Sequence, residues 1–212
     1  MLNKDVIFHI SGAIDPQAAD ALLYIYNEAP IVEAEMDGSK IKVSDEDSII
    51  PNRVETINEF GGKKILCTIP KDSPEFGFIV DIIEDWLPPH PDFEKVNFMQ
   101  IIEYQEESFF PFHKDIADSK DTATALFALN GEYGGGNLQV EENVFNIKNG
   151  DMVAFNNSTE RFHGVSPISW GNRFVLAIWF GREEEETEPN ENDMIQEMLS
   201  YYPNLPKTKM KE

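Results

Sequence analysis

The sequence predicts an α+β protein in which helices come first and an antiparallel β sandwich or barrel follows. Two observations carry this prediction. Up to about residue 95, apolar residues recur at helical spacing behind two helix-start signals. From about residue 96 onward, short runs of β-branched and aromatic residues alternate with turn signals and no crossover helix intervenes. Strands without crossover helices pair antiparallel, so we expect an all-β core supported by the N-terminal helices.

The two expected helices begin at similar signals. Asp15 precedes Pro16 and Ser73 precedes Pro74, which places a capping oxygen ahead of a proline at the first helical position. The prolines at 88–89 end the second helix. Its apolar stripe is interpreted as core packing rather than a cofactor site, and consists of Phe78, Ile79, Ile82, Ile83 and Trp86.

The β core is expected to contain six or more strands. The turn signals between them are "GEYGGG", "KNGD" and "SWGN". The predicted strand sequences are "NFMQIIEYQ", "TATALFAL", "GNLQV", "NVFNI", "DMVAF" and "RFVLAIWF".

Composition limits the class of protein. The 212 residues suit one domain, and the balance of 17 basic against 39 acidic residues gives a net charge of −22, which repels a phosphate backbone and disfavours a nucleic-acid partner. The lone Cys67 excludes an internal disulfide, no signal-like start is present, and no 18-residue apolar run occurs. We therefore expect a cytoplasmic protein that does not span a membrane.

The chain is expected to divide at residue 182. "REEEETEPNEND" at 182–193 is too charged to pack, so residues 1–182 form the predicted domain, with helical support over about 1–95 and the β core over about 96–182. Residues 183–212 are expected to be an acidic linker and a short tail.

Two His-x-Asp pairs compete as metal ligands. On a strand, residues two apart point to one face, so this spacing places an imidazole beside a carboxylate. His113 and Asp115 in "SFFPFHKDIAD" directly follow a strand-like run, whereas three prolines surround His90 and Asp92 in "PPHPD". The sequence therefore favours His113 and Asp115 as metal ligands, and His90 is expected to be a surface loop residue.

His163 in "RFHGVSP" is the only good candidate for a third ligand. Two imidazoles and one carboxylate form the facial ligand set of non-haem Fe(II) oxygenases and leave open positions on the metal. The alternative for His163 alone is a hydrogen-bonded core histidine.

Arg173 begins the otherwise apolar strand "RFVLAIWF", ten residues after His163. A buried charge needs a partner. That partner is either an acidic side chain of this chain or a carboxylate of a small bound anion, which a guanidinium can hold with two hydrogen bonds.

These motifs, in the order "HKD", "GGGNL", "KNGDMVAFNN", "HGVSP" and "GNRFVLAIWF", resemble the Fe(II)- and 2-oxoglutarate-dependent dioxygenases, in particular the prolyl 4-hydroxylase-like branch. The resemblance covers about residues 96–182. It implies a double-stranded β-helix (jelly roll) fold, with iron bound by the catalytic ligands His113, Asp115 and His163. It also implies that Arg173 binds the distal carboxylate of 2-oxoglutarate and that Tyr104 points into the cosubstrate pocket.

Two positions depart from the pattern of that branch. Ala128 stands where a tyrosine often precedes "LN", and Phe110 stands where a second aromatic residue is commonly tyrosine. The second contact to the distal carboxylate must then come from elsewhere, and Thr124 is the residue we expect to supply it.

The predicted function is hydroxylation of a C–H bond with Fe(II), 2-oxoglutarate and dioxygen, with ascorbate as a reductant, on a proline of a peptide or protein. The acidic surface leads us to expect basic residues beside that proline. A hydroxylase of a free amino acid or other small molecule is the first alternative, and a non-catalytic metal- or sugar-binding β-sandwich module is the second. A demethylase of alkylated nucleic-acid bases and a zinc hydrolase are less favoured, because Trp179 occupies the place of the demethylases' second arginine and no general base is evident.

Overall fold

The computed structural model describes residues 6–32, 34–37, 40–43, 50–58, 61–115, 121–157 and 161–181. The predicted linker and tail from residue 183 lie outside these ranges. The helical elements are α1 (Pro16–Glu28), α2 (Pro74–Ile83) and the 3-10 helices η1 (Glu84–Trp86) and η2 (Pro91–Phe93). The strands are β1 (Ile7–Ile10), β2 (Ala34–Asp37), β3 (Lys40–Val43), β4 (Asn52–Asn58), β5 (Gly62–Thr68), β6 (Lys95–Tyr104), β7 (Phe110–His113), β8 (Asp121–Ala128), β9 (Tyr133–Gly135), β10 (Leu138–Val140), β11 (Asn143–Phe145), β12 (Met152–Asn156), β13 (His163–Val165), β14 (Ile168–Gly171) and β15 (Arg173–Gly181).

Two antiparallel sheets pack face to face in the jelly roll that the resemblance implied. The larger sheet has seven strands in the order β1-β12-β8-β15-β6-β5-β4, and the smaller has four in the order β11-β10-β13-β7. Their facing side chains form one apolar cluster, in which Ile102 and Val175 of the larger sheet join Leu138 and Val165 of the smaller. Two further pairs, β14-β9 and β2-β3, complete the described strands.

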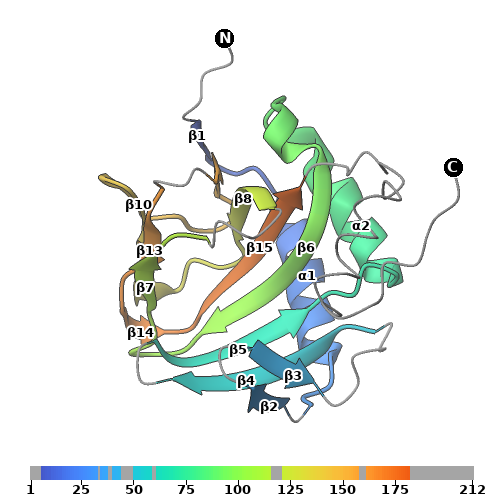
Figure 1. Ribbon diagram of the computed structural model, residues 1–212, viewed down its shortest axis with the longest axis vertical. Coiled ribbons are helices and arrows are strands. Elements are labelled where there is room, and N and C mark those ends of the chain that lie inside the picture. Colours follow the sequence, from blue (N-terminus) through green and yellow to red (C-terminus); the bar gives the residue numbers. More distant parts are fainter. Residues whose placement is uncertain are drawn as a thin grey trace, which may run out of the picture. The chain divides into compact units, whose positions relative to one another are not determined.

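The two helices cover the other face of the larger sheet (Figure 1). Leu22 of α1 and Ile79 of α2 pack with Ile101 and Leu176 in a second buried cluster. Because both faces of the sheet are covered, its central strands are apolar on both sides, as the run "RFVLAIWF" predicted. No helix in the described part of the chain is both long and apolar enough to cross a bilayer.

Both predicted helix starts are confirmed. Asp15 accepts a hydrogen bond from the amide of Ala18 at 2.8 Å, and Ser73 accepts one from the amide of Phe76 at 3.2 Å. The predicted core stripe of the second helix is partly wrong, because Phe78 is 45% exposed. Trp86, 40% exposed, falls in the 3-10 turn η1 after the helix ends, where the 100° rotation per residue no longer holds.

The prediction of a purely helical first half is incomplete. Strands β1, β4 and β5 lie in that half and join the larger sheet. In β5 the run begins with Lys63 and Lys64, so its alternation is weak in the sequence, and its pairing with β6 supplies the burial that the pattern alone did not indicate.

The register of the larger sheet determines which polar side chains lie next to one another. Arg173 of β15 lies opposite Tyr104 of β6, and Tyr104 lies opposite Lys64 of β5, so these three side chains share one face at the start of β15. Trp179 lies opposite Thr124 of β8 near the other end of β15. Six residues of strand, roughly 20 Å, separate the two rows.

Candidate active site

Three predicted metal ligands converge between the two sheets. His113 ends β7, and His163 begins β13 directly opposite it in the smaller sheet. The Nε2 atoms of His113 and His163 each lie 3.5 Å from Oδ1 of Asp115. Among the described residues this is the one group of three or more histidine, cysteine or acidic side chains close enough to share an ion.

Neighbouring groups orient two of the three ligands. Nδ1 of His113 lies 2.9 Å from the carbonyl oxygen of Pro111, which can only accept, so Nδ1 carries the proton and Nε2 presents its lone pair to the site. The hydroxyl of Thr124 donates to Oδ2 of Asp115 at 3.1 Å, which leaves Oδ1 facing the two imidazoles. Such outer contacts hold metal ligands in position.

The protonation states also suit metal binding. Burial would by itself raise the pKa of Asp115, but the hydrogen bond from His113 and the charges of the two imidazoles outweigh burial, and the pKa is lowered. Burial lowers the pKa of His163 to about 4, against the opposing effect of Asp115. A carboxylate and a neutral imidazole are the forms that bind a metal.

The competing pair, His90 and Asp92, has a structural role. Nδ1 of His90 accepts a hydrogen bond from the amide of Asp92 at 3.3 Å and caps η2. No third ligand joins the pair in the described chain. The expectation that His90 is a surface residue was wrong, because its side chain is only 13% exposed and packs beside Phe93.

Arg173 is almost fully buried, with 1% of its surface exposed, and none of its three guanidinium nitrogens has a hydrogen-bond partner within the described residues. Its guanidinium carbon lies 5.1 Å from the centre of the Tyr104 ring. Burial raises the pKa of Tyr104, so the phenol stays protonated and the guanidinium gains no counter-charge from it. Of the two interpretations left open by the sequence, an internal salt bridge is absent from the described residues, and the charge is available to a bound anion.

A cavity of about 130 Å³ reaches from the three ligands to Tyr104. Most of its other walls are apolar, so water is poorly held there, and a bound anion would interact strongly with the nearby guanidinium. The walls include Ile102, Phe110, Leu126, Leu138, Val165, Ala177 and Trp179.

Tyr104 lines the cavity, but the structure does not bring Thr124 near Arg173, beside which it was expected to contact the distal carboxylate. Thr124 lies beside Asp115 at the metal end of the cavity. It is opposite Trp179, which is six positions along β15 from Arg173. Threonine has a short side chain, so it cannot reach that far. Its contribution is to the metal ligand instead.

Sequence reasoning missed residues around the guanidinium. Tyr133 begins strand β9 within the segment predicted as a turn; it is buried close to Arg173, and its hydroxyl donates to the carbonyl of Ile147 at 2.5 Å. A Cβ atom on Gly136 would lie 2.9 Å from Cδ of Arg173 and 2.6 Å from Cδ1 of Ile168. The aromatic residue within "GEYGGG" was the available signal, but the segment was interpreted only as a turn.

Gly136→Ala is expected to displace Arg173 and raise the KM for 2-oxoglutarate by roughly 10- to 100-fold, because a displacement of about 1 Å in a positioning group has effects of this size. Gly12→Ala is the matched control, since Gly12 has the same φ of +64° with no atom within 4 Å of the added methyl. Steady-state kinetics of both variants measure the effect. Equal KM values in the two variants would show that Gly136 is needed only for its backbone conformation and not for the position of Arg173.

Thr124→Val is expected to weaken Fe(II) binding by about 10- to 100-fold, because it removes a hydrogen bond to a ligand carboxylate. Thr122→Val is the control from the same strand, since the Thr122 hydroxyl donates to the backbone carbonyl of Asp92 at 2.6 Å. Anaerobic metal titration compares them. Undiminished affinity in Thr124→Val, or equal losses in both variants, would contradict the assignment.

The donor set fits a specific class of protein. Two imidazole nitrogens and one carboxylate oxygen on one side of an apolar cavity form the ligand set of mononuclear non-haem Fe(II) oxygenases, and the three ligand atoms lie within 4.8 Å of one another. Arg173 lies against Tyr104, which lines this cavity, and its guanidinium has no hydrogen-bond partner among the described residues, so it fits the free carboxylate of a chelating cosubstrate.

Comparison with known proteins agrees with this class. Residues 99–181 match the model of the 2OG-Fe(II) oxygenase superfamily. The match confirms the predicted enzyme class and its pair of Fe(II) and 2-oxoglutarate, and it argues against a non-catalytic module. No curated protein sequence matches the chain.

Solved structures share the fold at low sequence identity. The viral collagen prolyl hydroxylase of Paramecium bursaria Chlorella virus-1, in complex with 2OG, is 16% identical with a TM-score of 0.54 and covers 84% of this chain and 96% of its own. A Trichoplax adhaerens prolyl hydroxylase in complex with a hypoxia-inducible-factor peptide is 14% identical, with a TM-score of 0.58 and coverage of 82% and 83%. HygX from Streptomyces hygroscopicus, with nickel and 2-oxoglutarate bound, is 11% identical, with a TM-score of 0.56 and coverage of 84% of each chain.

Proposed function

We propose that this protein is a prolyl hydroxylase of peptides or proteins, with iron held by His113, Asp115 and His163 and the distal carboxylate of 2-oxoglutarate held by Arg173. One observation carries the site assignment: the cavity that holds the three ligands extends to Tyr104, whose ring lies against a buried guanidinium with no hydrogen-bond partner among the described residues. The solved prolyl hydroxylases of the same fold support the choice of substrate.

Each residue has a separate task in this proposal. When bound, iron and 2-oxoglutarate supply the oxidising chemistry that inserts an oxygen atom from dioxygen into a C–H bond. The three ligands hold one face of the metal, and Arg173 fixes the cosubstrate by its far end. The apolar walls exclude water, which strengthens the contact between guanidinium and carboxylate.

The mouth of the cavity is suited to an apolar ring. Trp179 lines the cavity, and its ring centre lies 5.4 Å from that of Phe98, which is 40% exposed. A proline ring that stacks on this pair would lie on the same row of the sheet as Thr124, which contacts Asp115.

A matched peptide set tests the proposal. Peptides with a central proline and Lys-rich, neutral or Glu-rich flanks, beside free proline, are incubated with Fe(II), ascorbate and 2-oxoglutarate, and mass spectrometry detects the gain of one oxygen atom. We expect the Lys-rich peptide to react fastest, with a preference that weakens as salt rises. Turnover of free proline alone would instead support a hydroxylase of small molecules. Equal turnover of the peptides with Lys-rich, neutral and Glu-rich flanks would contradict the expected preference for basic residues.

A further inference from the structure

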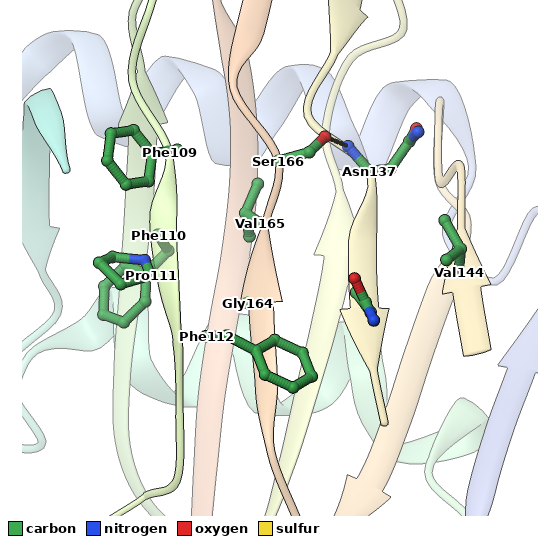
Figure 2. Close-up of a pocket in the computed structure, with 10 residues that line it drawn as sticks. Phe109, Phe110, Pro111, Phe112, Asn137, Val144, Gly164, Val165 and Ser166 are labelled. Carbon is green, nitrogen blue, oxygen red and sulfur yellow. Dashed lines mark hydrogen bonds between the residues drawn. The ribbon is translucent and has the colours of Figure 1, made fainter. Parts of the chain in front are cut away.

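The outer face of the smaller sheet carries a second hollow, of about 340 Å³, on the side of β7 and β13 opposite to the metal ligands. We call it the outer groove; it is shown in Figure 2. Its walls come from all four strands of the sheet and the residues beside them. The residues that line it are Phe109, Phe110, Pro111, Phe112, Asn137, Gln139, Val144, Gly164, Val165 and Ser166.

The hollow has a clear cause in the local structure. The pairing of β7 with β13 shifts register between His163 and Val165, so Pro111 and Phe112 both lie opposite Gly164. A Cβ atom on Gly164 would lie 2.9 Å from the carbonyl oxygen of Phe110 and 3.2 Å from the Phe112 ring. Only glycine fits under this bulge, and the missing side chain leaves the floor of the groove open.

The walls combine apolar rings with polar side chains. Phe112 is 50% exposed and stacks on Phe162 with ring centres 5.7 Å apart, and Val144 on the opposite wall is 61% exposed. Asn137 and Gln139 add amide groups to the lining of the groove. Exposed apolar side chains gathered around a hollow mark an interaction site more often than scattered ones do.

The charges near the groove differ between its two ends. The exposed Glu106 and Glu107 lie beside the Phe109 end, where the amide of Glu107 donates to the carbonyl of Ile168. The nearby Lys63 contacts Glu55 at 3.0 Å. At the other end the ammonium of Lys114 lies 4.6 Å from the centre of the Phe162 ring.

We propose that the outer groove docks a proline-containing segment of the protein substrate, with a basic residue of that segment directed toward Glu106 and Glu107. Aromatic and apolar walls with interspersed amide groups suit a polyproline II segment, whose rings need apolar contacts and whose backbone carbonyls have no internal donors. This inference rests on the proposed function for the identity of the partner. The docked segment differs from the one that is hydroxylated, because the groove and the metal ligands lie on opposite faces of the smaller sheet.

Docking at a second site raises the effective concentration of the target proline at the metal. A long peptide that carries both segments is therefore expected to have a KM roughly 10-fold or more below that of a short peptide with the target proline alone. The kcat should be the same for both peptides, since the chemistry at the metal is unchanged.

The test measures binding and turnover separately on the full chain. Fluorescence anisotropy follows a labelled proline-rich peptide with lysines at one end, and a second peptide in which alanine replaces every proline. Val144→Lys is expected to weaken binding of the first peptide by about 10-fold, as is the double variant Glu106→Lys and Glu107→Lys. Ile31→Lys is the control for the first variant because Ile31 is 63% exposed, and Asp20→Lys with Glu28→Lys on α1 repeats the charge change of the second.

The outcomes separate this inference from the proposed function. If peptide binding depends on Val144 and on proline but the protein hydroxylates no proline, the docking proposal would stand and the proposed substrate would be wrong. If the protein hydroxylates proline with the same KM in the parent, in Val144→Lys and in the double variant Glu106→Lys with Glu107→Lys, the docking proposal alone would be contradicted. A change of sedimentation in Val144→Lys without a change in peptide binding would also overturn it, because the surface would then be a contact between copies of this chain.

Discussion

His113→Ala and His163→Ala are each expected to lower 2-oxoglutarate turnover by at least about 100-fold, because losing an outer contact to a metal ligand already costs 10- to 100-fold and these variants lose the ligand itself. Both imidazoles lie 3.5 Å from the same oxygen of Asp115, so neither variant keeps the facial set of three donors. Anaerobic Fe(II) titration and succinate formation measure the two losses in each variant.

His90→Ala is the control for this prediction. His90 also has an aspartate two residues on, but its Nδ1 accepts from the amide of Asp92, so its removal should lower stability slightly and leave Fe(II) affinity unchanged. Loss of iron in His90→Ala with intact binding in His113→Ala would show that the site had been placed at the wrong pair.

Arg173→Leu is expected to raise the KM for 2-oxoglutarate by roughly 30- to several thousand-fold, which corresponds to about 2–5 kcal/mol for one partner of a buried charge pair. Iron should still bind, because Arg173 lies about six strand positions from the row that holds Thr124 beside Asp115. Titration calorimetry with 2-oxoglutarate in the iron-loaded protein measures the loss directly.

The same variant has a second expected effect of opposite sign. In the protein without cosubstrate, the guanidinium is buried and has no hydrogen-bond partner among the described residues, so Arg173→Leu should raise the free energy of unfolding by about 1–3 kcal/mol. Denaturant unfolding with and without 2-oxoglutarate tests this, and the stabilisation by 2-oxoglutarate seen in the parent should disappear.

Arg161→Leu provides the contrast. Arg161 is equally buried, but its Nη1 donates to the carbonyl of Val6 at 2.9 Å and to Oδ1 of Asn156 at 2.8 Å. Its loss should therefore destabilise the protein. If Arg173→Leu lowered stability by the same amount and left the KM for 2-oxoglutarate unchanged, the buried arginine would be a structural residue and the cosubstrate site would lie elsewhere.

Local signals were enough to place the helices and the metal ligands. A capping oxygen followed by proline sets a helix start through contacts within three residues, so Asp15 and Ser73 could be interpreted without knowledge of the fold. The spacing of His113 and Asp115 acts through the alternation of a single strand. The choice of this pair over His90 and Asp92 likewise needed only the prolines around His90, which exclude a strand.

Properties that depend on strand pairing could not be predicted from the sequence. Strand β5 has little alternation of its own and becomes part of the larger sheet by pairing with β6, which packs the partly buried Leu66 opposite Ile102. The exposure of Phe78 has a similar origin, because the packing of α2 on the sheet decides which side of the helix is covered.

The class of chemistry could be predicted from the residues alone, because the metal ligands and Arg173 lie within short motifs whose order and spacing resemble one family. The roles of Thr124 and Gly136 depend on how the strands pack. Thr124 contacts Asp115 rather than the region of Arg173, because β8 pairs with β15 in a register that places it opposite Trp179. Gly136 leaves space for Arg173, and Gly164 leaves the floor of the outer groove open. In both places a Cβ atom would collide with residues that are distant in the sequence. Such contacts depend on how one strand packs against another, so a local pattern of residues does not predict them.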